Sequence, residues 1–283
     1  MIKIISDSTC DLSKELIEKY NIQILPLHVH LGEEEHLDGA TITPDEIYAW
    51  ADANNTTPKT SAASMTEFMD VFQPIIDNGD EIICFSISST LSANYNVMRL
   101  AVDEMEAEDK IRIIDSANLS TGIGHLVIEA AILAQEGKSL DEIVEKIEAY
   151  KPLVSTSFVV DTLTYLHRGG RCSGVAALAG GVLKLHPKIV LENGKMDASK
   201  KYRGKMDAVV LSYAKDMEED LVKAKKDRVF ITHSGCSDAI LGRVKEYLEG
   251  LNHFDEILTT RAGSVISSHC GYGTVGVLFI KGE

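Results

Sequence analysis

The sequence is short of basic residues and has no long hydrophobic run. It contains 28 lysines and arginines against 43 aspartates and glutamates, a formal net charge of −15 at pH 7. This balance disfavours a nucleic-acid partner, which usually requires a basic face. No apolar stretch reaches the roughly 18 residues of a transmembrane helix. The acidic Asp7 comes too early for a secretory signal peptide, so we expect a cytoplasmic protein.

Cysteine is scarce, and the common catalytic and cofactor motifs are missing. The five cysteines are odd in number and none forms a C-x-x-C pair, which predicts reduced thiols and neither a disulfide framework nor a zinc site. Spaced clusters of metal-ligand type are also missing, so we expect no metal and no cofactor. The G-x-x-x-x-G-K-[ST], G-x-G-x-x-G and G-x-S-x-G motifs do not occur, which disfavours a nucleotide loop or a hydrolase elbow.

In the first half of the chain, apolar runs of strand length alternate with helical patterns. We expect strands over residues 2–5, 22–29, 81–85 and 111–114, and helices over residues 43–50, 64–75, 92–105 and 126–135. Two of these helices open on capping boxes, at Thr43 and at Ser64. The alternation predicts an α/β fold with a mostly parallel sheet covered by helices.

The second half is less regular and predicts a mixed sheet. We expect strands over residues 153–160, 228–233, 257–260 and 275–280, a hairpin around the turn at 192–195, and helices over residues 161–166, 175–185, 208–224 and 239–248. We place a domain boundary near residue 150. The chain then divides into an N-terminal α/β domain, residues 1–150, and a C-terminal α/β domain, residues 151–283.

Small hydroxyl residues crowd the turn over residues 86–92, here named the serine turn. It joins a buried strand to a helix, where unpaired backbone N–H groups and the helix dipole favour an anion. The turn contains no glycine, and no base follows before Arg99, which favours a carboxylate over a phosphate. Serine, threonine and aspartate are also ordinary turn formers and helix caps, so a purely structural role stays open.

Three other segments are candidates for binding. The loop over residues 57–64 offers the hydroxyls of Thr60 and Ser61, although helix capping would also explain it. His269 lies in a glycine-dense segment beside Cys270, and we expect it to donate a hydrogen bond to an anion, because adjacent residues rarely face each other as a catalytic pair. Residues 167–205 are locally basic, which fits either a solvated face or a docking surface for an acidic partner.

Several segments, in order along the whole chain, resemble the DegV family. They are residues 6–12, 60–64, 88–95, 166–171, 201–204 and 269–276. The resemblance implies two α/β domains with one long-chain fatty acid in a tunnel between them. It also implies a non-catalytic acyl-carrier subunit of a bacterial fatty-acid kinase. A separate kinase subunit would phosphorylate the bound carboxylate with ATP, and the acyl phosphate would feed phospholipid synthesis. Transient membrane contact for lipid exchange would fit this role.

The resemblance also assigns residues. Hydroxyls of Thr60, Ser61 and Ser92, the amide of Ala93 and the side chain of His269 would hold the carboxylate, and Arg171 and Arg203 would serve kinase docking or the surroundings of the head group. The tunnel lining would come from residues 175–185 and from N-terminal helices. The chain departs from the family pattern at Ala62-Ala63, Ala93-Asn94 and Tyr272, which bears on the geometry of the site.

Two other functions stay open from the sequence. Ser92 or Cys270 could be the nucleophile of a hydrolase or transferase acting on a small acyl or phosphoryl substrate, although neither has an obvious base, since the adjacent His269 is not expected to face Cys270. The chain could also be a regulator that senses a small carboxylic acid.

Overall fold

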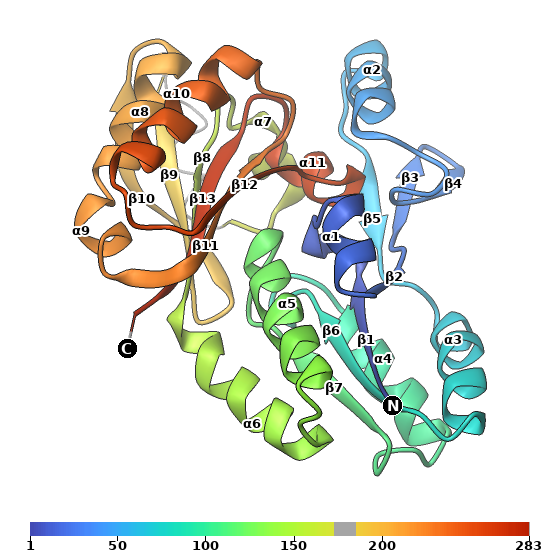
Figure 1. Ribbon diagram of the computed structural model, residues 1–283. Helices are drawn as coiled ribbons and strands as arrows, with labels where there is room; N and C mark the ends of the chain where they lie inside the picture. Colours follow the sequence, from blue (N-terminus) through green and yellow to red (C-terminus); the bar gives the residue numbers. More distant parts are fainter. Residues whose placement is uncertain (173–184, 283) are drawn as a thin grey trace.

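The N-terminal half forms a four-stranded sheet in which all neighbouring strands are parallel, as predicted (Figure 1). The computed structural model describes residues 1–172 and 185–282. In sheet order, the strands are β2 (Gln23–Leu25), β1 (Ile2–Asp7), β6 (Glu81–Ser86) and β7 (Ile111–Asp115). Ile4 pairs with Ile83, and Phe85 pairs with Ile114. In this parallel register, the C-terminal ends of β1, β6 and β7 lie at the same edge of the sheet.

Alternate side chains of this sheet enter two different cores, because successive residues of a strand point to opposite faces. Ile5 and Ile82 pack in one core, against α3 (Met65–Asp77) and α4 (Asn94–Glu104). Ile4 and Ile83 pack in the other, against α5 (Thr121–Gln135) and α6 (Leu140–Tyr150). The first eleven residues of α5 are buried, which is typical of a helix enclosed on all sides.

The C-terminal half forms a six-stranded mixed sheet, which confirms the predicted class. Only β11 and β12 are parallel, and the other neighbouring strands are antiparallel. In sheet order, the strands are β10 (Lys195–Arg203), β9 (Leu185–Glu192), β8 (Val154–Val159), β13 (Val275–Lys281), β11 (Ala224–His233) and β12 (Glu256–Arg261). The hairpin predicted around residues 192–195 is the β9–β10 connection.

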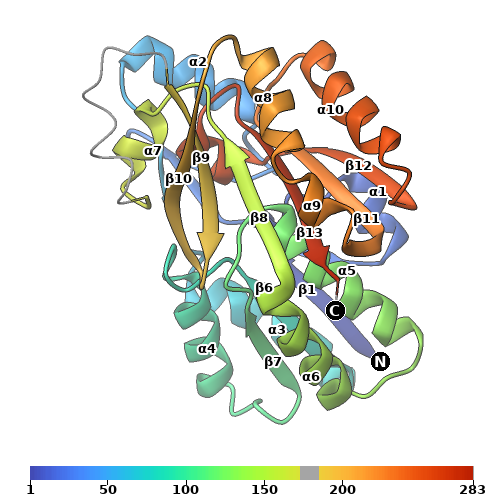
Figure 2. The same ribbon diagram turned by 90° about the vertical axis from the view of Figure 1, so that its left-hand side faces the viewer.

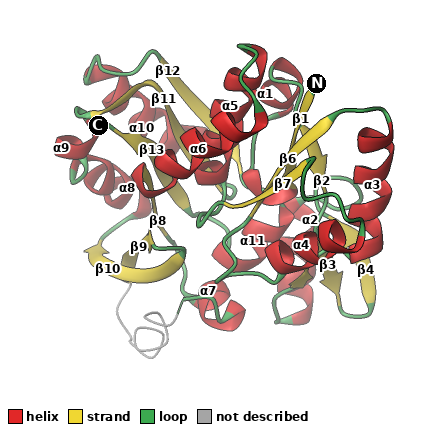
Figure 3. Cartoon of the chain, turned by 90° about the horizontal axis from the view of Figure 1, so that it is seen from below, coloured by secondary structure: helices red, strands yellow, loops and turns green. Residues whose placement is uncertain are grey.

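Helix α5 lies between the two large sheets (Figure 3). Phe230 and Leu278 share its core, whereas Val229 and Val277 face the opposite side of the six-stranded sheet. The helices on that opposite side are α8 (Met206–Lys215), α9 (Glu218–Leu221) and α10 (Asp238–Gly250). A short helix η2 (Lys151–Leu153) connects α6 to β8. The position of a domain boundary near residue 150 stays a prediction.

A third, three-stranded antiparallel sheet was not expected. Its strands, in sheet order, are β4 (Glu34–Leu37), β3 (His28–Leu31) and β5 (Lys59–Ser61). The single strand predicted over residues 22–29 is therefore wrong: it is β2 and β3, in two sheets. Pro26 stands between them, and proline has no N–H with which to continue a ladder. The elements packed near this sheet include α2 (Pro44–Asn54), α7 (Thr164–Gly169) and α11 (Ser264–Cys270).

Other predicted boundaries change as well. The helix predicted over residues 208–224 is split into α8 and α9, and β11 already begins at Ala224. Helix α4 begins at Asn94, two residues later than expected. Two short N-terminal elements are η1 (Ser8–Cys10) and α1 (Lys14–Lys19). The helix predicted over residues 175–185 lies outside the described residues, apart from its last one, which begins β9. Within the described part of the chain, no helix is long and apolar enough to span a bilayer.

Candidate functional site

A cavity of about 240 Å³ lies where segments from both halves of the chain meet. Its walls combine β5, the turn before α4, the loop before α5, the start of β10 and helix α11. The lining residues are Leu27, Thr60, Ser61, Ala62, Ile87, Leu91, Ser92, Ala93, Leu119, Arg171, Met196, Val265, Ile266, His269 and Cys270. Six of the seven residues that the sequence singled out therefore share one cavity. Arg203 is the exception: it is exposed and ends β10.

Thr60 and His269 meet in this cavity, although they are far apart in the sequence. The Oγ1 atom of Thr60 lies 2.8 Å from Nε2 of His269. Burial, and secondarily the nearby charge of Arg171, lowers the pKa of His269 to about 4, so its imidazole is neutral near pH 7. Among the described residues, its buried Nδ1 has no hydrogen-bond partner. A Cβ atom at Gly169 would lie 2.6 Å from that Nδ1, so the histidine occupies space that a glycine leaves free.

Carboxylates from the N-terminal half hold the start of α11. Asp11 Oδ1 accepts a hydrogen bond from the backbone N–H of Gly263 at 2.8 Å, and Asp38 Oδ1 accepts one from Ser264 at 2.6 Å. Both carboxyl groups are buried, and this burial raises their pKa values despite the hydrogen bonds. Two acidic side chains thus cap the short helix that carries His269. The sequence suggested only a glycine-dense segment here, so this helix was missed.

Most hydroxyls of the serine turn are used by the fold and not by the cavity. Ser88 Oγ donates to the carbonyl of Gly194 at 2.8 Å, and Thr90 Oγ1 donates to the same oxygen. Gly194 lies in the β9–β10 turn, which reaches toward α4 (Figure 2). Ser89 Oγ donates to Asp115. These residues therefore attach the hairpin and a neighbouring strand end, which corrects the expectation of an anion site along the whole turn.

A carboxyl group of the protein itself lies at the centre of this crossover. Asp7 is fully buried, and its Oδ2 accepts from the backbone N–H of Ile87 and from the side chain of Asn94, each at 2.8 Å. Asn94, one of the departures from the family pattern, thereby fixes the start of α4. The last residue of the serine turn and the residue after it face the cavity instead. Ser92 and Ala93 line it, and Ser92 Oγ accepts a hydrogen bond from the N–H of Asn94 at 3.2 Å.

Two other side chains limit the chemistry of the cavity. Arg171 is exposed at its rim, where Nη1 donates to the carbonyl of Gly169 at 2.6 Å. Cys270 is buried, and burial raises the pKa of its thiol to about 12. A thiolate nucleophile is therefore disfavoured at neutral pH. Within the described ranges, no group of three or more His, Cys, Asp or Glu residues could hold a metal ion.

The apolar wall of the cavity was not identified from the sequence. Leu119, Ile266 and Cys270 also line a second cavity of about 20 Å³, which continues over Phe158 and Leu278 of the six-stranded sheet. The two cavities thus share an apolar wall, here named the apolar path, although hydroxyl side chains such as Ser120, Thr156 and Thr232 also line the second cavity. No sequence signal separates these side chains from ordinary core residues, because both are simply apolar. The predicted contribution of residues 175–185 concerns positions that, except for Leu185, are not described.

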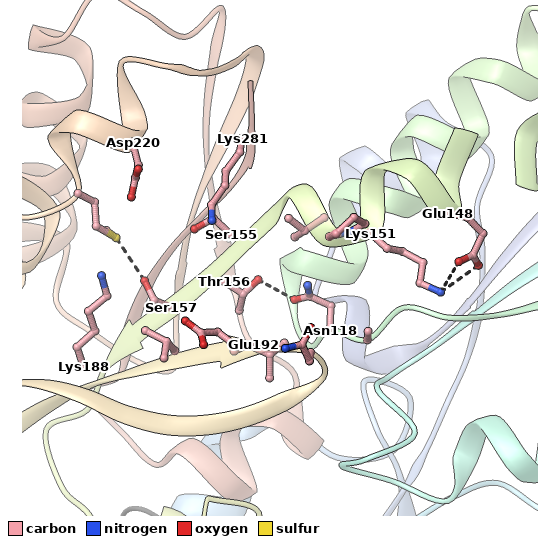
Figure 4. A pocket seen from close by; sticks show the side chains of 17 residues that line it. Asn118, Glu148, Lys151, Ser155, Thr156, Ser157, Lys188, Glu192, Asp220 and Lys281 are labelled. Atoms are coloured by element: carbon pink, nitrogen blue, oxygen red, sulfur yellow. Dashed lines mark hydrogen bonds and ion pairs between the residues drawn. The ribbon is translucent and has the colours of Figure 1, made fainter. Parts of the chain in front are cut away.

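A larger cavity, of about 580 Å³, lies elsewhere, between β8, η2 and the β9–β10 turn (Figure 4). Charged side chains of both signs line it, and Lys151 is already paired with Glu148 at 2.7 Å. None of the residues predicted to bind a ligand is among those described around it. Its mixed charge indicates no single class of ligand, and size alone does not make it the functional site.

Comparison with known proteins agrees with the sequence resemblance. The model of the DegV family, described as uncharacterised, matches residues 1–282. A DegV domain-containing protein of Clostridium perfringens is 33% identical over 280 residues, covering 99% of this chain and 98% of that protein. A fatty-acid-binding DegV-family protein from Thermus thermophilus has a TM-score of 0.91 at 30% identity, with 99% of both chains covered.

A second solved structure is a stearic-acid-binding protein from Eubacterium ventriosum. Its TM-score is 0.87 at 28% identity, and 99% of this chain and 98% of that chain are covered. Both solved proteins thus share the complete fold described above and are named for binding a fatty acid. With a family model over nearly its whole length and a relative of this identity, the chain belongs to the DegV family.

Proposed function

We propose that this protein binds one long-chain fatty acid in the cavity between β5, α4 and α11. The observation that carries the proposal is the composition of that cavity, in which uncharged donors meet an apolar path. The carboxylate would accept hydrogen bonds from Thr60, Ser61, Ser92, the N–H of Ala93 and His269. The fatty-acid-binding relatives named above support the same ligand class.

The energetics of such a ligand suit these walls. Burial of each CH₂ group contributes about 0.8 kcal/mol, so the hydrocarbon chain would supply most of the affinity. The polar end needs only to satisfy one carboxylate. Neutral donors can do this while leaving an oxygen free to react. The neutral His269 fits this requirement, and the guanidinium of Arg171 lies exposed at the rim.

The site favours a carrier over a hydrolase. An activated serine needs a base within hydrogen-bond reach, whereas the bond recorded for Ser92 Oγ is from the N–H of Asn94. Nε2 of His269 faces Thr60, and the thiol of Cys270 is held neutral. We therefore infer a non-catalytic subunit. A sensor of a small carboxylic acid would leave the apolar path unused.

The proposed ligand class is tested by identifying the lipid that co-purifies with the protein. Protein expressed in a bacterial host and denatured for mass spectrometry should release close to one long-chain fatty acid per chain. Delipidated protein should bind oleate again with the same stoichiometry, whereas octanoate should bind far more weakly because it buries fewer CH₂ groups. An empty preparation that takes up no oleate would contradict the proposal, and equal affinity for octanoate would favour the small-acid sensor.

We further infer that the loaded protein presents its carboxylate to a separate kinase subunit in the cytoplasm, with transient membrane contact for lipid exchange. The acyl phosphate formed with ATP would feed phospholipid synthesis. Exposed Arg203, with Arg171 near the head group, would contribute to docking, because basic side chains attract an acidic partner surface.

Kinase coupling is tested with oleate-loaded protein, a kinase subunit related to dihydroxyacetone kinases, and ATP. Acyl phosphate should be trapped as a hydroxamate by hydroxylamine. Arg203→Glu should lower its formation by about tenfold or more, through charge reversal at the docking surface, and leave oleate affinity within about twofold. Lys226→Glu, an exposed reversal on β11, is the matched control. Absence of hydroxamate with fully loaded protein would refute the coupling and leave fatty-acid binding intact.

A further inference from the structure

The side chain of Ser61 contacts His30, whereas that of Thr60 contacts a different histidine, His269. Nε2 of His30 lies 2.9 Å from Oγ of Ser61. His30 is on β3, where it pairs with Lys59 of β5, and the adjacent β3 residue of the same face, His28, pairs with Ser61. Because side chains alternate along a strand, Thr60 and Ser61 point to opposite faces of β5. The two hydroxyls are thus contacted by histidines from opposite sides.

His30 lies beside a polar network on its own face of the three-stranded sheet. Glu35 of β4 contacts Nδ1 of His28, and Glu67 of α3 lies 3.0 Å from Nε2 of the same ring. Glu67 also accepts from the N–H of Ser64, 2.8 Å away, in the capping box of α3. The network therefore runs from the start of α3 through His28 to Glu35, and His30 lies next to its end.

The other charged groups that face His30 leave its Nε2 free to donate. Oε2 of Glu35 lies 3.9 Å from Nδ1 of His30, an ion-pair distance but too long for a hydrogen bond. Oε1 of Glu35 is already in contact with His28. Lys59, the register partner of His30, brings only donors and cannot accept the imidazole proton. The partner of Nε2 is Ser61, and the tautomer of His30 decides which of the two atoms donates.

The direction of this bond decides what Ser61 can do. A serine hydroxyl has one hydrogen, and an ionised carboxylate only accepts. If Ser61 donated to His30, it would have no hydrogen left for a ligand. If His30 donates, the Ser61 hydrogen remains available.

We propose that His30 is a positioning residue, which donates from Nε2 to Ser61 and thereby directs the Ser61 hydroxyl hydrogen to the fatty-acid carboxylate. This inference rests on the proposed function. It gives each hydroxyl of β5 one histidine partner, as His269 is the partner of Thr60. On the other side of the ring, the ion-pair contact of Nδ1 with Glu35, at 3.9 Å, restrains His30.

A double-mutant cycle tests the inference. His30→Ala and Ser61→Ala should each weaken oleate binding by about tenfold, the size of one lost charge-assisted hydrogen bond. The double variant should be no weaker than either single variant, because His30 acts through Ser61. His30→Gln should bind within about threefold of the parent, because its amide nitrogen replaces Nε2 as a donor. His36→Gln on β4 is the matched control: its register partner is Val29, so it lies on the opposite face.

A spectroscopic measurement distinguishes positioning from simple support of the sheet. Long-range ¹H–¹⁵N spectra should show a hydrogen on Nε2 of His30, and the Nε2 shift should move on addition of oleate in the parent but not in Ser61→Ala. Additive losses in the cycle, or parent-like binding by His30→Ala, would overturn the inference and leave fatty-acid binding unaffected. Failure of the parent to bind oleate at all would instead refute the proposed function.

Discussion

Replacing Thr60 by valine and Ser92 by alanine together is expected to weaken oleate binding by at least about 100-fold. A hydrogen bond to a charged group contributes about 1.5–3 kcal/mol, and each 1.4 kcal/mol is about tenfold in affinity. The two hydroxyls lie in the same cavity but on different elements, β5 and the turn before α4. Valine keeps the shape of threonine, so the apolar path for the hydrocarbon chain is preserved. Calorimetric titration of the delipidated variant measures the loss.

Ser89→Ala is the matched control, since its hydroxyl lies in the same serine turn but donates to Asp115 and is not among the cavity-lining residues. We expect its oleate affinity to stay within about twofold of the parent, because no carboxylate contact is removed. Thermal unfolding of each variant separates lost binding from lost folding. Affinity of the Thr60, Ser92 double variant within threefold of the parent would show that the carboxylate does not bind at these hydroxyls.

The candidate site was partly predictable because polar residues at the ends of elements form local patterns. Thr60, Ser61 and Ser92 are visible in that way. The structural use of Ser88 and Thr90 was not, because their shared acceptor is the carbonyl of Gly194, about a hundred residues away. Hydroxyls that bind a ligand and hydroxyls that bind a distant carbonyl have the same sequence signature. Only the fold separates them.

The fold shows the same division between local and distant causes. The large sheets were predictable because their strands are apolar runs that alternate with helical periodicity. Strands β3 and β5 are short and partly polar, and they depend on pairing with each other. Helix α11 follows a glycine, and its first N–H groups are held by Asp11 and Asp38 from the other half of the chain. Elements that are stabilised by contacts with distant residues need little apolar periodicity of their own. Their sequences therefore give only a weak indication of secondary structure.

A second large effect is expected at the contact between α5 and the six-stranded sheet. Glu129→Ala should lower the free energy of unfolding by about 3–5 kcal/mol, because it leaves the buried charge of Arg228 with only the more distant and more exposed Asp227, 3.9 Å away. Glu129 lies on α5, and its Oε1 accepts from Nη1 of Arg228 on β11 at 2.6 Å. The two side chains are only 7% and 5% exposed. Lys225 also reaches both oxygens of Glu129, each at 2.9 Å. Denaturant unfolding measures the loss.

Two matched variants show whether the effect comes from burial of the charge or from the ion pair itself. Glu219→Ala removes an exposed pair with Lys223 on the surface and should change stability by less than about 1 kcal/mol. Replacing both Glu129 and Arg228 by leucine should restore most of the stability, because a buried ion pair is often no better than well-packed apolar residues. Lys225 could then keep its contact with Asp227. If the double leucine variant is as unstable as Glu129→Ala, the pair is needed for its own attraction, and α5 is held to the sheet by charge as well as by apolar packing.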